Sequence, residues 1–493
     1  MTTECSELSI GNVVGDKAAE RGTTSLNSMD NRIQIEKTRP SGHVHPRTPV
    51  NVRWWKRFFY LSIAREISSM VKYYDELVQY RRQPHDNGAL FDLIDNSNKR
   101  YSEDSDIPAQ SKSSKRSAIL IHGNFNFSFD IQGLLTSLHD RVDSRSRLVV
   151  VAYNSYLRSI FRIATLLGIK SGKYDELTFI TRNDMENLAK ISGYQVVRYR
   201  PVVYCPFFLL GIGSLINYSL PIIPLLNRFA MLEVMVFRPL PRGAQKRPSL
   251  SILIPARNEK GNIQNAIDRL PDFNTRTEVI FVEGKSTDGT WEEIDRVVKE
   301  YNGSLILKRF QQNGKGKGDA VRKGFAHATG ELLTILDADL TMPPEHLPRF
   351  YEAYVQGHGD FINGTRLMYP MEGQAMRSLN WIGNIFFAKA LSYVLSMNIG
   401  DSLCGTKLFS KDDYQRMIRW RSDFGDFDPF GDFEVLFPAA ALGLGIVDIP
   451  VRYRDRTYGT TNISRFRHGT MLLKMVLVGL FRIKSGKWVT ISG

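Results

Sequence analysis

The chain has 493 residues, of which 42% are apolar and 24% charged, and this composition excludes collagen-like and wholly disordered proteins. Lys and Arg number 65 against 51 Asp and Glu, so the formal net charge is +14 and anionic partners are favoured. The cysteines Cys5, Cys205 and Cys404 are too scattered for a disulfide framework or a paired-cysteine zinc site. Because the first residues contain no apolar stretch, we expect no signal peptide and a reduced, cytoplasmic compartment.

The N-terminal part of the sequence divides into segments that differ in composition and in hydrophobic pattern. Residues 1–50 are rich in Ser, Thr, Asn and Arg and are predicted to be disordered. Residues 51–82 have the pattern of one amphipathic helix with aromatic residues at its start, and residues 95–117 that of a linker or surface loop. Two apolar runs, Ser117–His122 and Arg147–Tyr153, are typical of buried strands.

Residues 201–227 form an uncharged stretch that is long enough to cross a bilayer. Four prolines and Asn217 interrupt it, and a spanning helix tolerates proline only where its neighbours satisfy the freed backbone groups. We therefore expect a buried or interfacial segment rather than a span.

From Leu250 onward, strands and helices alternate. Apolar runs begin the segments LSILIPARNE (250–259) and EVIFVEGKSTDGT (278–290), and LILKRF (305–310) and ELLTILDADL (331–340) contain two more. Helix-like segments separate them. This order predicts an α/β fold with a mostly parallel sheet and helices on both faces. Ligands of such sheets bind beyond the carboxyl ends of the strands, where this chain has its acidic and glycine-rich turns.

Asp337 and Asp339 follow the fourth of these strands. Being two residues apart, they point to one face, where their charges repel unless a cation lies between them. Their oxygens suit Mg²⁺ or Mn²⁺, which keep open positions for substrate phosphates. A solvated Asp-x-Asp turn is the alternative.

Residues 314–319 (GKGKGD) do not have the spacing of the common phosphate-binding loop. Lysines such as Lys317 on a glycine-rich segment that opens a helix still make a site accessible to phosphate. A solvated basic turn is equally compatible with the pattern.

Seven segments together resemble the family 2 glycosyltransferases, which have the nucleotide-sugar-binding fold called GT-A. They occur in the family's order: IPARNE (254–259), VEGKSTDGT (282–290), GKGDAVRKGFAHATG (316–330), DADL (337–340), GDSLCGTK (400–407), FGDFE (430–434) and VRYRDRTYGTTNI (451–463). The last segment is similar to that of transferases with polyprenyl-phosphate or dolichol-phosphate acceptors. The family usually has two Asp residues where this chain has Glu283–Gly284.

The resemblance implies an inverting transferase that uses a nucleotide-diphospho-sugar. It places the donor base near Pro255, Arg257, Glu259 and Glu283. It places the diphosphate at a Mg²⁺ or Mn²⁺ ion on Asp337 and Asp339, with Lys317 beside it.

The acceptor implied by the resemblance is a polyprenyl-phosphate lipid or a growing glycan. If its reacting group is a hydroxyl, a carboxylate must take the proton, and Asp432 is the candidate. If it is a phosphate, it is already ionised, and Arg454 and Arg456 would hold its charge. The alternative for Asp432 is a structural carboxylate that caps the helix following it.

Residues 147–170 and 184–204 resemble the second half of a class I methyltransferase, in which a strand, a helical excursion and a final strand pair close the sheet. The glycine-rich turn of the S-adenosylmethionine site is missing from 83–200. We therefore expect an inactive, truncated methyltransferase-like domain over 51–245, a glycosyltransferase domain over 246–463, and a tail over 464–493.

The tail is basic and amphipathic, because Asp455 is the last acidic residue of the chain. This pattern is typical both of a membrane-surface helix and of a helix that packs on its own domain. With the aromatic cluster Trp54–Tyr60 and the 201–227 stretch, it predicts a peripheral protein on the cytoplasmic face of a membrane.

Two other classes of function compete with an enzyme. A nucleic-acid-binding protein would account for the charge, but the sequence has no helix-turn-helix, zinc-finger or RNA-binding aromatic motif, so no nucleic-acid partner is expected. A non-catalytic, membrane-associated scaffold would account for Glu283–Gly284 and the missing glycine-rich turn.

Overall fold

The computed structural model describes residues 54–81, 88–102, 115–126, 128, 130–167, 178–243, 246–369, 378–425, 431–459 and 465–485. The prediction of disorder for residues 1–50 concerns a segment outside these ranges. The described residues belong to one compact unit, Arg47–Gly493.

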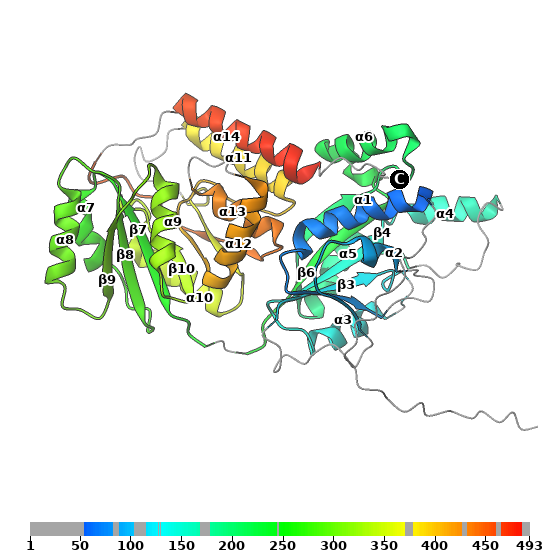
Figure 1. Cartoon of the computed structure of the whole chain (residues 1–493), viewed down its shortest axis with the longest axis horizontal. Helices are drawn as coiled ribbons and strands as arrows, with labels where there is room; N and C mark the ends of the chain where they lie inside the picture. Colours follow the sequence, from blue (N-terminus) through cyan, green and yellow to red (C-terminus); the bar gives the residue numbers. More distant parts are fainter. Residues whose placement is uncertain are drawn as a thin grey trace, which may run out of the picture. The chain divides into compact units, whose positions relative to one another are not determined.

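The N-terminal half contains a six-stranded sheet with the order β2-β1-β3-β4-β6-β5 (Figure 1). Neighbours among β1 to β4 are parallel, and β6 runs antiparallel between β4 and β5. The strands are β1 (Glu76–Tyr80), β2 (Lys99–Ser102), β3 (Ser117–His122), β4 (Arg147–Tyr153), β5 (Tyr194–Val202) and β6 (Leu232–Pro239).

Helices cover both faces of this sheet. They are α1 (Trp54–Val71) and α2 (Ala89–Leu93) on one face and α3 (Ile131–His139) and α5 (Arg182–Ile191) on the other. A further helix, α4 (Leu157–Leu166), follows β4 and exposes several apolar side chains. In β3, Leu120 packs in the core that α1 and α2 share, whereas Ile121 packs in the core that α3 and α5 share. The alternation follows from the period of two in a strand.

Two predictions in this half are wrong. The helix expected over 51–82 ends at Val71, and β1 follows with all five residues buried. The expected linker 95–117 contains β2, which pairs with β1. The strands expected at Ser117–His122 and Arg147–Tyr153 are confirmed as β3 and β4.

The apolar stretch 201–227 does not form one helix. Its first residues complete β5, and the rest divides into α6 (Ile212–Ser219) and three 3₁₀ turns, η3 (Leu209–Gly211), η4 (Leu220–Ile222) and η5 (Pro224–Phe229). None of the helices in the described part of the chain is long and apolar enough to cross a bilayer.

The C-terminal half contains a seven-stranded sheet with the order β13-β11-β12-β10-β7-β8-β9. It is mostly parallel, as predicted, and β12 runs antiparallel to both of its neighbours. The strands are β7 (Leu250–Ala256), β8 (Thr277–Glu283), β9 (Ile306–Gln311), β10 (Leu332–Ile335), β11 (Phe361–Thr365), β12 (Lys407–Ser410) and β13 (Ile446–Pro450).

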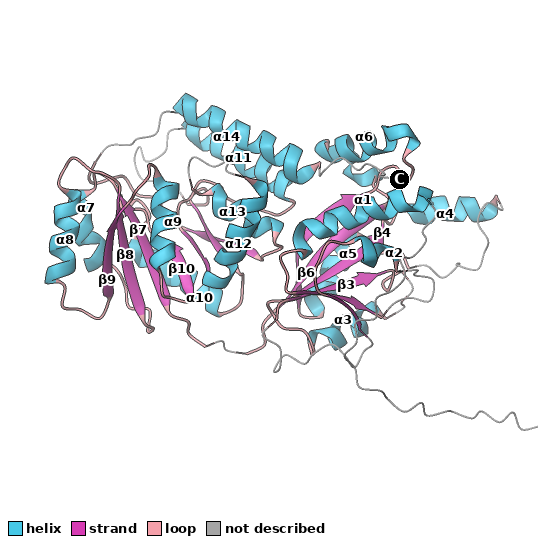
Figure 2. Ribbon diagram, viewed as in Figure 1, coloured by secondary structure: helices cyan, strands magenta, loops and turns pink. Residues whose placement is uncertain are grey.

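Helices again flank the sheet on both sides (Figure 2). In β7, Ile252 and Ile254 face the core with α7, α8 and α10, and Leu253 faces the core with α9 and α11 to α14. The helices are α7 (Lys260–Asp268), α8 (Thr290–Glu300), α9 (Lys317–His327), α10 (Leu347–Val355), α11 (Ser378–Leu395), α12 (Lys411–Phe424), α13 (Phe433–Ala441) and α14 (Arg465–Gly479).

The described part of the basic tail is helical and packs on the protein. Leu472, Met475 and Val476 of α14 are buried in the core beside α11 and α13, whereas Leu473 and Leu477 are exposed. The alternative of a helix packed on its own domain is therefore correct for one face of α14. The side chains of Trp54 and Trp55 lie outside the described residues.

Candidate active site

Three neighbouring strands, β10, β7 and β8, end at the same edge of the second sheet. Directly after them, Leu340, Asn258 and Lys285 have left-handed backbones, with φ of 52°, 56° and 59°. Such conformations are costly for residues other than glycine, and they cluster at functional sites. The turns that carry the predicted donor-binding residues are therefore the strained part of this sheet.

Lys317 and Asp337 form an ion pair at this edge, with 2.7 Å between Nζ and Oδ1. Burial alone would raise the pKa of Asp337, but Lys317 outweighs it and the pKa is lowered. The glycine at 405 makes the arrangement possible, because a Cβ there would lie 2.2 Å from Asp337 Oδ2. The sequence predicted Lys317 and Asp337 together, and the structure brings them into contact.

Asp432 lies beside this ion pair at the start of α13. It is 7% exposed, and its Oδ1 is 3.6 Å from the ammonium nitrogen of Lys317 and 4.0 Å from that of Lys407. Among the described residues, its side chain makes no capping hydrogen bond to α13, and Oδ1 has no hydrogen-bond partner. The capping alternative is therefore not what the structure shows, and this buried oxygen is directed at two lysines.

Close contact between two glycines brings Lys317 and Asp432 together. A Cβ on Gly431 would lie 2.8 Å from the Cα of Gly318, so the beginnings of α9 and α13 meet backbone to backbone. A larger residue at position 431 would separate the lysine from the carboxylate.

Arg456 links the last family-like segment to the strand ends. Its Nη1 donates to Glu259 Oε1 at 2.8 Å, and its Nη2 donates to Asp339 Oδ2 at 2.6 Å. Burial raises the pKa of Glu259. The charge of Arg456 and a hydrogen bond from Asn262 lower this pKa and offset part of the rise. One guanidinium from a segment distant in sequence thus binds two carboxylates of the predicted donor site.

The other predicted residues are placed less closely. Glu283 is 1% exposed and accepts hydrogen bonds from the backbone of Ser286 and from Gln311, so its carboxylate holds the turn after β8. Pro255 is half-buried near the end of β7, and Arg257 is exposed just beyond it.

Gly284 replaces the family's second Asp, and a Cβ there would lie 3.2 Å from the Cβ of Arg257. A side chain at this position would therefore crowd Arg257. Arg454 is exposed, and its backbone N–H donates to the carbonyl of Thr341 at 2.9 Å, beside Asp339.

Several residues of the site were not predicted. Lys407 is fully buried and donates to the carbonyl of Cys404, although its segment GDSLCGTK was noted in the sequence. Arg366 forms a two-pronged ion pair with the buried Asp401 of the same segment, with distances of 2.7 and 3.0 Å. The segment GDSLCGTK contains both Lys407 and Asp401, but its local pattern assigns neither of them a role.

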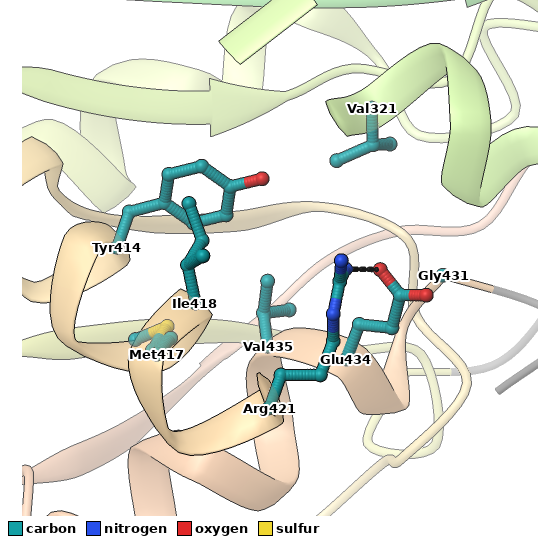
Figure 3. A pocket seen from close by; sticks show the side chains of 8 residues that line it. All are labelled: Val321, Tyr414, Met417, Ile418, Arg421, Gly431, Glu434 and Val435. Carbon is teal, nitrogen blue, oxygen red and sulfur yellow. Dashed lines mark hydrogen bonds and ion pairs between the residues drawn. The ribbon is translucent and has the colours of Figure 1, made fainter. Parts of the chain in front are cut away.

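Glu434, two residues after Asp432, joins three helices. It accepts from Arg322 of α9 at 2.6 Å and from Arg421 of α12 at 2.5 Å. Glu434 and Arg421 line a small hollow next to Gly431 (Figure 3). These contacts hold α13, and thus Asp432, against the helix that carries Lys317.

Asp337 and Asp339 are the candidates for holding a metal. In the described residues no group of three or more His, Cys, Asp or Glu side chains could hold an ion by itself. Each of the two carboxylates has a cationic side chain as partner, which shows that positive charge is stable there. Two hard oxygen donors fit Mg²⁺ or Mn²⁺ when the ion takes its other ligands from substrate phosphates.

Residues 251–418 match the family model described as "Glycosyl transferase family 2". The low-salt glycan biosynthesis hexosyltransferase Agl6 of Haloferax volcanii is 28% identical over 236 residues, which cover 47% of this chain and 54% of that protein. The dolichol-phosphate mannosyltransferase of Saccharomyces cerevisiae is 39% identical over 122 residues, 24% of this chain and 44% of that protein. The dolichyl-phosphate hexose transferase of Haloferax volcanii is 28% identical over 231 residues, 46% of this chain and 92% of that protein.

The chain thus spans about half the length of the first two of these relatives. Among solved structures, glucosyl-3-phosphoglycerate synthase from Mycobacterium tuberculosis with Mn²⁺ and uridine-diphosphate-glucose is 16% identical, with a TM-score of 0.35. That match covers 48% of this chain and 79% of the synthase. The match to the glycosyl transferase family 2 model thus covers β7 to β12 and the turns that carry Lys317, Asp337 and Asp339, which is about a third of the chain.

Proposed function

We propose that this protein is an inverting glycosyltransferase of the GT-A fold that moves a sugar from a nucleotide-diphospho-sugar to a polyprenyl-phosphate acceptor. The observation that carries the proposal is that the ammonium nitrogen of Lys317 lies 2.7 Å from Asp337 Oδ1 and 3.6 Å from Asp432 Oδ1. The ion pair between Asp339 and Arg456 lies beside them. The names of the dolichol-phosphate relatives support this class of acceptor.

The donor would lie across the ends of β7, β8 and β10. Arg257 and Glu283 would meet the base, and Lys317 would bind the diphosphate through its ammonium group. Asp337 and Asp339 would hold Mg²⁺ or Mn²⁺, which as a Lewis acid stabilises a departing diphosphate.

The acceptor would approach from the side of Asp432. A hydroxyl acceptor must lose a proton, and the unpartnered Oδ1 of Asp432 is placed to accept it. A phosphate acceptor needs no base, because its oxygens are already ionised near neutral pH. Arg454 and Arg456 would then hold its charge.

The test is transfer of a labelled sugar from a panel of nucleotide sugars to polyprenyl phosphate and to a glycan hydroxyl. With a phosphate acceptor, Asp432→Asn should keep most of the rate. With a hydroxyl acceptor it should lose about 10²–10⁴-fold. Absence of both transfer and donor hydrolysis with every nucleotide sugar would contradict the proposal and favour the scaffold.

We further propose that the N-terminal half is an inactive methyltransferase-like domain. Its β4, helical excursion and antiparallel β5–β6 pair support the resemblance. The sequence that follows β1, residues 81–88, contains one glycine, Gly88, and so lacks the glycine-rich pattern of an S-adenosylmethionine site.

A further inference from the structure

The connection between β5 and β6 exposes large apolar side chains. Leu210 is 98% exposed, Leu225 82% and Phe229 61%. Phe207, Leu209, Ile212 and Leu215 of the same connection are each about half exposed. Soluble proteins rarely present so many neighbouring apolar side chains to water without a partner for them.

The loop that carries Leu210 has a fixed shape. The side-chain amide of Asn217 donates to the carbonyl of Cys205 at 2.8 Å, and its oxygen accepts from the backbone of Tyr204 and of Cys205 at 2.8 and 2.9 Å. Leu209 and Leu210 both have left-handed backbones, with φ of 46° and 53°. Asn217 thus ties α6 to the residues that follow β5. In the loop between them, Leu209 and Leu210 adopt a conformation that leucine rarely shows, and Leu210 is exposed to solvent.

Helix α4 extends this apolar surface. The hydroxyl of Tyr156, just before α4, donates to the carbonyl of Phe229 at 2.7 Å, so the two segments adjoin. Along α4, Ile160, Ile163 and Leu166 are 49%, 56% and 79% exposed. We call residues 203–231 together with 154–167 the docking surface.

The charges of the docking surface have one sign. Its charged residues are Arg158, Arg162 and Arg228, all exposed, and it contains no Asp or Glu. A surface of leucines and arginines complements anionic headgroups above an acyl layer. A second copy of the chain fits it less well, because the arginines and the net charge of +14 would repel those of the partner.

We propose that the docking surface binds an anionic lipid bilayer by lying in its plane. Leu210 and Leu225 enter the boundary between headgroups and acyl chains, and the three arginines bind lipid phosphates. In-plane binding agrees with the short helices of this connection. The inference does not depend on the proposed transfer reaction, and it gives the N-terminal half a role as the part that holds the chain on the lipid surface.

The test is flotation of the full-length protein with vesicles of phosphatidylcholine alone or with 30% phosphatidylserine. The wild type should float with the anionic vesicles and much less with the neutral ones. Leu210→Glu and Leu225→Glu should each lower the bound fraction about tenfold or more, because each removes one leucine from the acyl boundary. Arg228→Gln should weaken binding to the anionic vesicles selectively.

Ile191→Glu is the matched control, because Ile191 is 61% exposed at the end of α5 and lies outside the docking surface. It should float like the wild type. The melting temperatures of the variants should equal that of the wild type, since the replaced leucines are almost fully exposed.

Undiminished flotation of both leucine variants would overturn the proposal. So would sedimentation showing a lipid-free dimer that Leu210→Glu converts to a monomer, because the surface would then be an interface between copies. Neither outcome bears on sugar transfer to a soluble acceptor analogue, so the two proposals fail separately.

Discussion

The backbone of Gly405 passes against the carboxylate of Asp337. A Cβ at position 405 would lie 2.2 Å from Asp337 Oδ2 and 2.4 Å from the ammonium nitrogen of Lys317. The segment before β12 therefore forms a wall of the site that has room only for glycine.

We expect Gly405→Ala to inactivate the protein. The added methyl group must displace Asp337 or Lys317, and a displacement of about 1 Å at a reacting group can cost on the order of 10²-fold in rate. Sugar-transfer rates measure the effect. The matched control is Gly383→Ala in α11, where a Cβ would meet nothing within 4 Å and the rate should be unchanged.

Asp339→Asn should lower the transfer rate by roughly 10²–10³-fold, the usual cost of removing an electrostatic group from a site of this kind. The side chain loses both its ion pair with Arg456 and its charge as a metal ligand. Binding of Mn²⁺, measured by calorimetry with the nucleotide present, should weaken in parallel. The exposed neighbour of Arg456 provides the control, as Asp455→Asn should leave both quantities unchanged. Full activity in EDTA would remove the metal from the proposal.

Lys484 should make the stability of the folded chain depend on pH. It is 4% exposed, and burial, followed by the charges of Arg200 and Arg198, lowers its pKa to about 6. An unfolded lysine has a pKa of about 10.4, so between about pH 6 and pH 10 the folded chain binds fewer protons than the unfolded chain. The free energy of unfolding should therefore fall as the pH falls through this window.

Lys484→Met should raise the free energy of unfolding at pH 7 by about 1–4 kcal/mol, because folding then no longer has to remove the proton from a lysine that becomes buried. The gain should shrink as the pH rises toward the unfolded pKa and vanish above it, where the lysine is neutral in both states. Lys474→Met, at an exposed position of α14, should show no such pH dependence in chemical denaturation. A destabilised Lys484→Met at pH 7 would contradict the assignment.

We expect no binding of S-adenosylmethionine, because the sequence lacks the glycine-rich pattern that such a site requires after its first strand. Calorimetry with the full-length protein should show no heat of binding up to millimolar cofactor. Micromolar affinity for the cofactor or its demethylated product would show that the N-terminal half is a working site.

The second sheet was largely predictable because its strands are short apolar runs, each followed by a polar turn. Parallel strands bring their carboxyl ends to one edge, which placed Asp337 there, and the family resemblance placed Lys317 beside it. The first sheet was harder. Residues 76–80 continue the apolar pattern of α1, and only pairing with β2 and β3, distant in sequence, makes them a strand.

The missed site residues have a common reason. Lys407 begins β12, an antiparallel strand inserted between β10 and β11, and no local pattern places it near Asp432. Arg456 was predicted to hold acceptor phosphate, but its contacts with Glu259 and Asp339 depend on how a long C-terminal segment returns to the sheet. Such contacts join residues that are far apart in the sequence, so the local pattern around each residue does not predict them.

Relieving the backbone strain of the left-handed turns at the strand ends should raise the melting temperature of this chain and lower its activity. Lys285 and Leu340 each adopt a conformation that costs a side chain about 1–2 kcal/mol and costs glycine almost nothing. Selection of a random library for survival at high temperature should therefore enrich glycine at the exposed Lys285. It should not do so at Leu340, because that side chain is buried in the core and its loss would cost more than the relieved strain. The survivors should melt later and work worse, because the loosened turn after β8 would no longer aim Glu283. A heat-resistant variant that keeps its catalytic power must carry its stabilising substitutions away from this edge of the sheet.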